Sequence, residues 1–359
     1  MEYQERIDLL KELCEAKGIS GHERNVTRIM KKHLQDYADE FLYDNLGSLI
    51  AKKAGSGDVK VMLAGHVDEI GFLVSKIEKD GFLRLHPIGG WWGHVLMAQR
   101  VVITTKDGKD IIGVIGAAAP HGMGPEERKK VKDVKDLFVD LGVKDAEAVK
   151  KLGIRVGDPV TPLSTFEVMN DPNYVLCKAF DDRVGAAVAI EVMKNLKNED
   201  HPNILYSCGT VQEEVGLRGA RTAAYVVDPD IAIAIDVTVA DDFPGGKSNC
   251  KLGLGTAISI ADGSVIGHHA LVRLLEDICI EKNIPYTYDM LSAGGTDSGE
   301  IHKSRDGVVN ATISIPSRYC HSHNTIIHMR DYDATVALLT EFVKRLDRKT
   351  LEELKEAKR

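Results

Sequence analysis

The sequence predicts an α/β fold in which a mostly parallel sheet carries helices on both faces, with a small β-rich module inserted into it. Strand-like runs alternate with helical segments from about residue 174 onward. Short β-type runs separated by Gly, Pro and Asp instead fill residues 69–162. A chain of 359 residues exceeds the usual size of one hydrophobic core. We therefore expect one domain from residues 1–68 and 163–359, and an inserted domain from residues 69–162.

The N-terminal segment predicts two helices. Ile7, Leu10 and Leu13 recur at helical spacing in the first helix. Ser20 and Glu23 then stand at the spacing of a capping box, in which each side chain satisfies a free backbone amide. A second helix is expected to begin there and to run to about Asp39.

The remaining elements follow in chain order. Two strands at 46–53 and 60–68 are joined by a turn-forming stretch. The insert shows β-type runs at 81–90, 100–116 and 154–163, and one charged segment at 125–138. Strand and helix then alternate through 174–197, 203–214, 230–239, 268–282 and 309–323, and a long C-terminal helix starts near Asp331.

Composition excludes several classes of partner. The net charge of −8 and the pI of about 5.9 argue against nucleic acid. The six cysteines are scattered without paired spacing, which is typical of buried thiols in a reducing compartment. The first residues are charged and amphipathic, unlike a signal peptide, and no apolar run approaches the roughly 20 residues of a membrane helix. We expect a cytoplasmic protein without a membrane partner.

Acids and histidines follow directly on apolar strands at several places. These residues are His66, Asp68, Glu213, Glu214, Asp236, His321 and His323, while Asp181 and Asp182 stand just before a helix. The carboxyl ends of neighbouring parallel strands share one edge of a sheet, where ligands bind. Side chains that are distant in sequence are therefore expected to converge there.

A cluster of buried carboxylates is unstable unless cations stand among the acids. Two histidines with three or four carboxylates and no thiolate suit Zn, Co or Mn. Two ions sharing one bridging carboxylate account for so many ligands better than one ion does.

Each part also has a structural interpretation without function. His66 and Asp68 can form a satisfied loop pair, and Asp181 and Asp182 can cap a helix. A Glu pair is common on solvated faces, and Asp236 can cap a turn. His321 and His323 alternate along an extended segment, so one of them is expected to point away from what the other contacts.

The motifs HVDEIG, AFDDRVG, VQEEVGLRGA, AIDV, GGTDSG and RYCHS, in this order, resemble those of the tetrahedral (TET) aminopeptidases. This is the deblocking and glutamyl aminopeptidase group of the clan MH dinuclear metallopeptidases. The resemblance covers essentially the whole chain. It implies a Zn-peptidase-like fold with a small β-barrel or PDZ-like insert.

The resemblance also implies roles for individual residues. Two divalent ions would be bound by His66, Asp181, Glu214, Asp236 and His321. Asp181 would bridge them, with Asp182 a neighbour or cap. Glu213 would be the general base, and Asp68 would orient His66. The stretch after His321 departs from the family pattern, which leaves His323 open as the terminal ligand.

Similar proteins assemble through the insert into dimers and then into a hollow tetrahedral dodecamer. His121 and the pair Trp91 and Trp92 lie in the insert and are candidates for subunit contacts or for a place beside a neighbouring site; local core packing is the alternative for the tryptophans. The glycine-rich segment from Gly294 to Asp297 either brings backbone close to the site or forms a plain turn.

The expected function is removal of N-terminal residues from peptides with a free amino end by water activated between two metal ions. Three alternatives stay open: a related metallo-deacylase or carboxypeptidase, a metal-independent glycoside hydrolase of the endoglucanase type, and a non-enzymatic scaffold. The sequence does not fix the preferred N-terminal residue, the metal used, or dimer against dodecamer.

Overall fold

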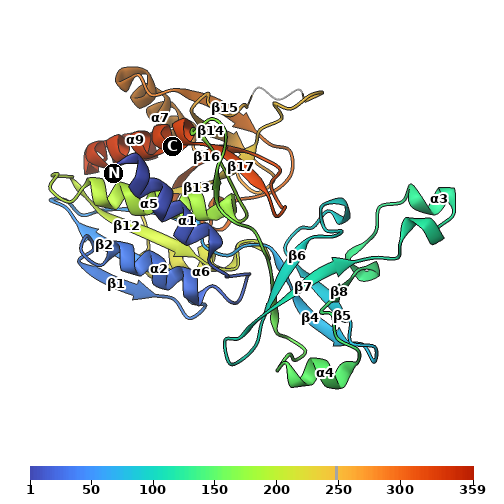
Figure 1. Ribbon diagram of the computed structural model, residues 1–359. Coiled ribbons are helices and arrows are strands. Elements are labelled where there is room, and N and C mark those ends of the chain that lie inside the picture. Colours follow the sequence, from blue (N-terminus) through green and yellow to red (C-terminus); the bar gives the residue numbers. More distant parts are fainter. Residues whose placement is uncertain (247–249) are drawn as a thin grey trace.

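The protein, described by a computed structural model over residues 1–246 and 250–359, consists of one large sheet flanked by helices and one small closed barrel. Figure 1 shows the barrel projecting from the side of the sheet. The predicted fold class is confirmed. No helix in the described residues is long and apolar enough to cross a membrane. The six cysteines, all within those residues, form no disulfide.

The large sheet has the order β1-β2-β12-β3-β13-β16-β17-β11-β10. Its central strands β12 (Asn203–Thr210), β3 (Val59–His66), β13 (Ile231–Val239) and β16 (Val309–Arg318) run parallel. The antiparallel strands on either side are β1 (Glu40–Tyr43), β2 (Leu49–Ala54), β17 (Thr325–His328), β11 (Tyr174–Cys177) and β10 (Glu167–Val168). A side branch adds β14 (Thr256–Ala261) and β15 (Tyr286–Met290) against β16.

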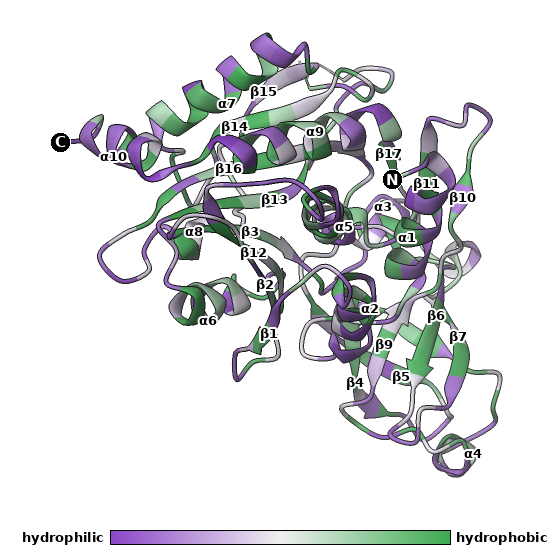
Figure 2. Cartoon of the chain, turned by 90° about the vertical axis from the view of Figure 1, so that its left-hand side faces the viewer, coloured by the Kyte–Doolittle hydropathy of each residue, from purple (hydrophilic) through white to green (hydrophobic). Residues whose placement is uncertain are grey.

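Both faces of this sheet are covered by helices. One face packs against α1 (Tyr3–Glu15), α2 (Arg24–Leu34), α5 (Phe180–Asn195), α7 (His269–Lys282) and α9 (Met329–Arg345). The other packs against α6 (Arg218–Val227) and α8 (Ser298–Ile301). Figure 2 shows α5 and α6 on opposite sides of the central strands. Because both faces are buried, β3 reads as a nearly continuous apolar run.

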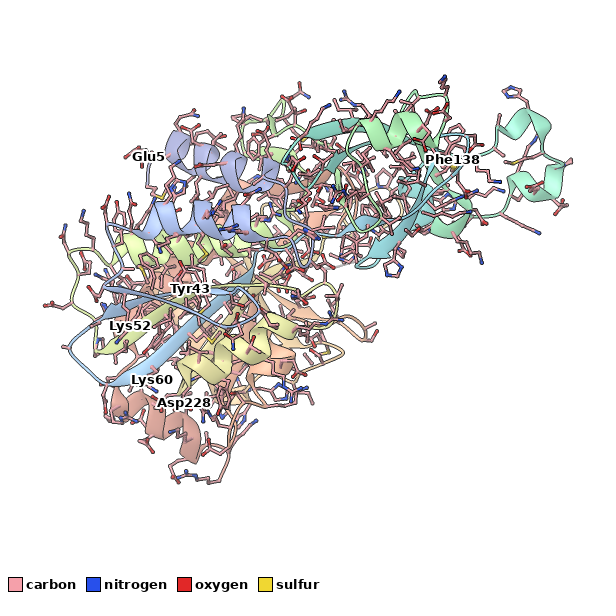
Figure 3. The ribbon with its side chains drawn as sticks, turned by 90° about the horizontal axis from the view of Figure 1, so that it is seen from below. Glu5, Tyr43, Lys52, Lys60, Phe138 and Asp228 are labelled. Carbon is pink, nitrogen blue, oxygen red and sulfur yellow. The ribbon has the colours of Figure 1, made fainter. Side chains whose placement is uncertain are left out.

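The barrel closes in the order β4-β5-β8-β7-β6-β9 around a core of its own. Its strands are β4 (Gly71–Ile77), β5 (Leu83–Ile88), β6 (Arg100–Thr104), β7 (Asp110–Gly116), β8 (Phe138–Asp140) and β9 (Pro159–Pro162). Short helices α3 (Pro125–Arg128) and α4 (Ala146–Lys151) and the 3₁₀ turns η1 (Gly93–Val95), η2 (Pro120–Gly122) and η3 (Val134–Asp136) connect them. In Figure 3, Phe138 of the barrel lies far from Lys60 and Asp228 at the other end of the molecule.

Three local predictions are wrong in detail. The second helix ends at Leu34 rather than near Asp39, and β1 follows it. The C-terminal helix is divided by Leu346 and Asp347 into α9 and α10 (Arg348–Glu356), because the Asp347 side chain caps a new helix.

The predicted capping box is the third. Ser20 does not cap α2, since its hydroxyl donates instead to the Asp68 carboxylate at 2.6 Å. Glu23 accepts from the backbone amides of Gly21 and Gln212. The pair that resembles a local cap therefore forms long-range contacts beside the end of β3.

Candidate metal centre

His66 and Asp68 lie at the carboxyl end of β3, where both side chains are buried. Asp68 Oδ1 lies 3.4 Å from His66 Nδ1, and the Asp68 carbonyl oxygen lies 3.2 Å from the same nitrogen. The Asp68 carboxylate also accepts from the amides of Glu213 and Glu214. Asp68 thus joins the end of β3 to the loop after β12 and directs His66 Nε2 away from itself.

Asp181 lies between the two histidines at the start of α5. Its Oδ1 is 3.0 Å from His66 Nε2, and its Oδ2 is 3.3 Å from His321 Nε2. Burial alone would raise the pKa of Asp181, but the two imidazoles outweigh it and lower the pKa below its ordinary value. One carboxylate with a different partner on each oxygen has the arrangement of a bridging ligand.

Asp182, by contrast, faces the backbone. Its oxygens accept from the amide of His66 at 3.0 Å and from that of Gly185 at 2.9 Å. The residue is fully buried. Its place is that of a cap that holds the end of β3 against α5.

Glu213 and Glu214 follow β12 and face different histidines. Glu213 Oε2 lies 3.9 Å from His66 Nε2, whereas Glu214 Oε2 lies 3.5 Å from His321 Nε2. Burial, together with the Asp181 charge, raises the pKa of Glu214 to about 8. Burial also raises the pKa of Glu213 well above its ordinary value.

Asp236 lies inside β13 and completes the cluster. It is buried, and its Oδ1 accepts from the following amide of Val237 at 2.7 Å. Burial and then the charge of Asp181 raise its pKa well above the ordinary value. The ligand atoms of His66, Glu213 and Asp236 lie within 4.8 Å of one another.

His66, Asp181 and Glu214 form a second such group, with the same 4.8 Å limit. His66 is common to both groups, and His321 stands beside the second. Glu213, which the resemblance treats as a base, falls within reach of an ion in the first group. The described residues thus form two overlapping groups of candidate ligands that share His66.

The two C-terminal histidines have separate places. His321 faces Asp181 and Glu214, and those acids, against the opposing effect of burial, raise its pKa to about 10. The His323 Nε2 instead lies 3.1 Å from the carbonyl of Arg100 in the barrel. Burial lowers the pKa of His323 to about 4. The structure brings His321, and not His323, to the acid cluster, by which we mean Asp181, Glu213, Glu214 and Asp236.

The donor set fits divalent cations. Buried Glu214 Oε1 has no hydrogen-bond partner among the described residues, which is unusual for a buried carboxylate oxygen. A cavity of about 10 Å³ beside it is lined by Asp181, Glu214 and His321. The raised pKa values of three clustered acids show how unfavourable their joint ionisation is without cations. Nitrogen and oxygen donors of this kind suit Zn, Co or Mn.

Sequence reasoning missed a buried ion cluster next to the site. Glu69 accepts from Lys178 Nζ at 2.8 Å and from an Arg183 guanidinium nitrogen at 3.1 Å. Arg183 also donates to the carbonyls of Leu13, Ala16, Gly18 and Val67. A signal existed, because these charges flank the HVD and FDD motifs within otherwise apolar sequence.

Asp297 is a second residue that was not given a role. It is buried, receives the Thr210 hydroxyl, and leaves Oδ1 without a partner among the described residues. Thr210 pairs with His66 in the sheet. The glycine-rich segment that precedes Asp297 packs closely, since a Cβ on Gly295 would lie 2.9 Å from the Ser264 hydroxyl.

Comparison with known proteins gives consistent matches. A family model described as M42 glutamyl aminopeptidase matches residues 47–338. The glutamyl aminopeptidase of Lactococcus lactis is 31% identical over 354 residues, 98% of this chain and 99% of that protein. The crystal structure of a TET aminopeptidase from the archaeon Thaumarchaeota archaeon SCGC AB-539-E09 is 40% identical with a TM-score of 0.95, covering 98% and 99% of the two chains.

Two further structures bear on assembly and on chemistry. The TET1 peptidase of Pyrococcus horikoshii, which can assemble into a tetrahedron or a large octahedral shell, is 30% identical with a TM-score of 0.85; the match covers 95% of this chain and 100% of that chain. A Thermotoga maritima structure described as an endoglucanase is 29% identical with a TM-score of 0.77, covering 96% and 99%.

Proposed function

The chain belongs to the M42 glutamyl aminopeptidase family, and from this premise we propose that it is a metal-dependent aminopeptidase that removes N-terminal residues from peptides. The observation that carries the proposal is the position of Asp181, with one oxygen toward His66 and the other toward His321. Two buried acids, Glu213 and Asp236, and the partly buried Glu214 lie near this bridge. Such a cluster is stable when cations lie within it.

In this proposal His66, Asp181, Glu214, Asp236 and His321 would hold two divalent ions, Zn or Co with Mn as a third choice. When bound, such ions acidify water and polarise carbonyl oxygens. Asp68 keeps the His66 ring in place through its contact with Nδ1. The carboxylates of Asp181 and Glu214 face the histidines, so the donor atoms lie together at one edge of the sheet.

Glu213 is the proposed general base. It takes a proton from the attacking water and passes it to the departing amine of the peptide. Burial raises its pKa, which suits a carboxylate that must accept and return a proton near neutral pH. Its position close to His66 and Asp236 supports this role.

The test is a screen of aminoacyl anilides with N-terminal Glu, Leu and Lys, performed after metal removal and again after addition of Zn, Co or Mn. We expect hydrolysis only with metal present and only with a free amino end. Turnover of N-acyl amino acids in place of the anilides would favour the deacylase or carboxypeptidase alternative.

The endoglucanase alternative has one specific observation in its favour, the description of the Thermotoga maritima structure. Glycoside hydrolysis of the usual kind uses two carboxylates and no metal. It gives no role to His66 and His321, which both face Asp181. Hydrolysis of a β-glucan that persists in chelator, without anilide hydrolysis, would replace our proposal.

We also propose that residues 69–162 act as a dimerisation domain and that dimers assemble into a tetrahedral dodecamer. The behaviour of the Pyrococcus horikoshii TET1 peptidase supports this. So do the barrel residues Trp92 and Ile112, which are 62% and 59% exposed. His121 lies in η2 of the barrel.

A further inference from the structure

We propose that the barrel completes the metal centre by fixing the ring of His321 through the carbonyl of Gly90. This proposal rests on the proposed metal dependence. Gly90 lies between β5 of the barrel and η1, whereas His321 follows β16 of the large sheet. The Gly90 carbonyl oxygen lies 2.7 Å from His321 Nδ1, although 231 positions separate the two residues.

This contact decides which ring nitrogen can bind an ion. A carbonyl oxygen only accepts, so the proton at this contact belongs to Nδ1. The other nitrogen, Nε2, faces the carboxylates of Asp181 and Glu214 at 3.3 and 3.5 Å. A backbone carbonyl on the remote nitrogen is a usual device for orienting a ligating imidazole. Gly90 is therefore a positioning residue that acts through His321.

The approach of the barrel loop leaves little space. A Cβ on Gly90 would lie 3.2 Å from His321 Nδ1 and 3.5 Å from its Cε1. Gly89 has φ +77°, and a Cβ there would lie 2.3 Å from Ile70 Cγ2 and 3.3 Å from Glu214 Oε2. Two consecutive glycines thus let backbone of the barrel rest directly against two side chains of the acid cluster.

The loop that carries Gly90 is held through Trp91, which contacts the barrel and also the ring of His323. The Trp91 indole donates to the Gly71 carbonyl at 2.9 Å and stacks on Phe72 with ring centroids 4.8 Å apart. The His323 ring, from the same loop as His321, lies against Trp91 and contacts the Arg100 carbonyl. The position of the barrel relative to the sheet therefore sets the position of His321.

The two proposed ion positions would therefore be supported by different parts of the protein. An ion held by His321 would depend on the barrel loop, whereas an ion held by His66 and Asp236 would depend on contacts made within the large sheet and its adjoining loops. A small change at residue 90 is expected to weaken one binding event and to leave the other intact.

The test is calorimetric titration of metal-free Gly90→Ala with Zn and with Co, compared with wild type. The added methyl displaces His321 by a few tenths of an ångström. We expect the affinity of one of the two binding events to fall by about 10-fold or more, as it does when other hydrogen-bond partners of metal-binding side chains are changed. The affinity of the second should change by less than about threefold. Trp91→Phe, which removes the donor to Gly71 and part of the ring that packs against Phe72 and His323, should weaken the first of these events by a smaller factor.

Gly124→Ala is the matched control. It lies in the same insert, has nothing within 4 Å of an added Cβ, and should bind both ions as wild type does. Melting of the metal-free variants shows whether the protein is folded. Equal weakening of both ions, or unchanged binding in Gly90→Ala, overturns the role of the barrel loop while metal dependence stands. Failure of the wild type itself to bind ions overturns both proposals.

Discussion

Glu213 and Glu214 are adjacent in sequence but differ in what their carboxylates meet. Glu214 lies beside His321 and Asp181, and Glu213 lies beside His66 and Asp236. Adjacent residues on a turn commonly point in different directions, and here Asp68 accepts both of their amides. These two contacts fix the turn so that the two carboxylates face different histidines.

Glu213→Gln should retain bound metal and fold but lose activity. An amide of the same shape cannot accept the proton of the attacking water, so we expect kcat to fall by about 10²-fold or more with little change in KM. Steady-state kinetics and metal analysis of the same preparation measure both properties. Near-normal turnover would show that another group is the base.

Asp181→Ala should lose metal rather than catalytic efficiency alone. Removing the carboxylate that faces both histidines takes a ligand from each proposed ion. We expect fewer than two ions per chain by elemental analysis after dialysis. Asp242→Asn is the control, because Asp242 pairs with Arg318 outside the acid cluster. Two ions per chain in Asp181→Ala would refute the bridging role.

At the residue scale, sequence alone locates side chains that follow strands and fails on contacts between distant segments. The candidates at strand ends, such as His66, Glu214 and Asp236, could be located because a parallel sheet gathers its carboxyl ends at one edge. The choice of His66, Asp181, Glu214, Asp236 and His321 as the ligands among all candidates rests on the resemblance to the TET aminopeptidases. The contact of Ser20 with Asp68 could not be predicted, because the capping-box spacing gives a complete local explanation. The choice between His321 and His323 likewise depends on where the barrel lies.

At the scale of elements, the ion cluster of Glu69, Lys178 and Arg183 joins the end of β3 to the start of α5 and the end of α1. Glu69→Gln would leave two buried cations without an anion. We expect it to lower the free energy of unfolding by about 3–5 kcal/mol, measured by urea denaturation of metal-free protein.

Glu191→Gln provides the comparison for that variant. Glu191 is equally buried but pairs with Arg6 and the N-terminal amine, which are partly exposed and can be hydrated after the change. Its loss of stability should therefore be clearly smaller. Equal losses in the two variants would mean that Glu69 does not neutralise both cations.

His268 makes α7 sensitive to acid. Its Nδ1 accepts from the Leu271 amide at the helix start, which requires the neutral ring. Burial, and then the charges of Lys358 and His269, lower the pKa of His268 to about 4. The unfolded chain, with a pKa near 6.5, therefore binds more protons between pH 6.5 and 4. The stability contributed by neutral His268 is present above pH 6.5 and is lost as the pH falls toward 4.

His268→Asn keeps a capping side chain but does not titrate. We expect the melting temperature of this variant, relative to wild type, to rise as the pH is lowered from 7.5 to 5.0. Thermal unfolding of the two metal-free proteins at both pH values measures the difference. A difference that does not change with pH would rule out titration of His268 as a cause of acid sensitivity.

At the scale of the whole molecule, the alternation of strands and helices predicts the parallel centre of the sheet but not its edges. The antiparallel strands β1, β10 and β17 are short, and the sequence predicts no strand at any of the three. Their pairing is decided by unsatisfied backbone groups of the neighbouring strand, which sequence periodicity does not report. The sequence indicates the barrel only through the short β-type runs of residues 69–162 and through the resemblance to the TET aminopeptidases.

The outer face of the barrel leads to the prediction about assembly. Ile112 and Val114 are two positions apart on β7, so both point to the same side, and they are 59% and 41% exposed. Trp92 is also exposed on the barrel. Exposed apolar side chains aligned on one strand are typical of a surface that another subunit covers.

Sedimentation velocity of the wild type should therefore show a species well above the 39.3 kDa of one chain. The double variant Ile112→Glu/Val114→Glu places two like charges in the proposed contact and should shift the distribution to smaller species. Tyr225→Glu, an equally exposed position on α6 of the sheet body, should sediment as wild type does. Because the barrel also carries Gly90, metal titration of the double variant separates two roles of the insert. Unchanged metal affinity in a smaller species would show that assembly and support of His321 are independent, whereas wild-type sedimentation of the double variant would remove β7 from the interface.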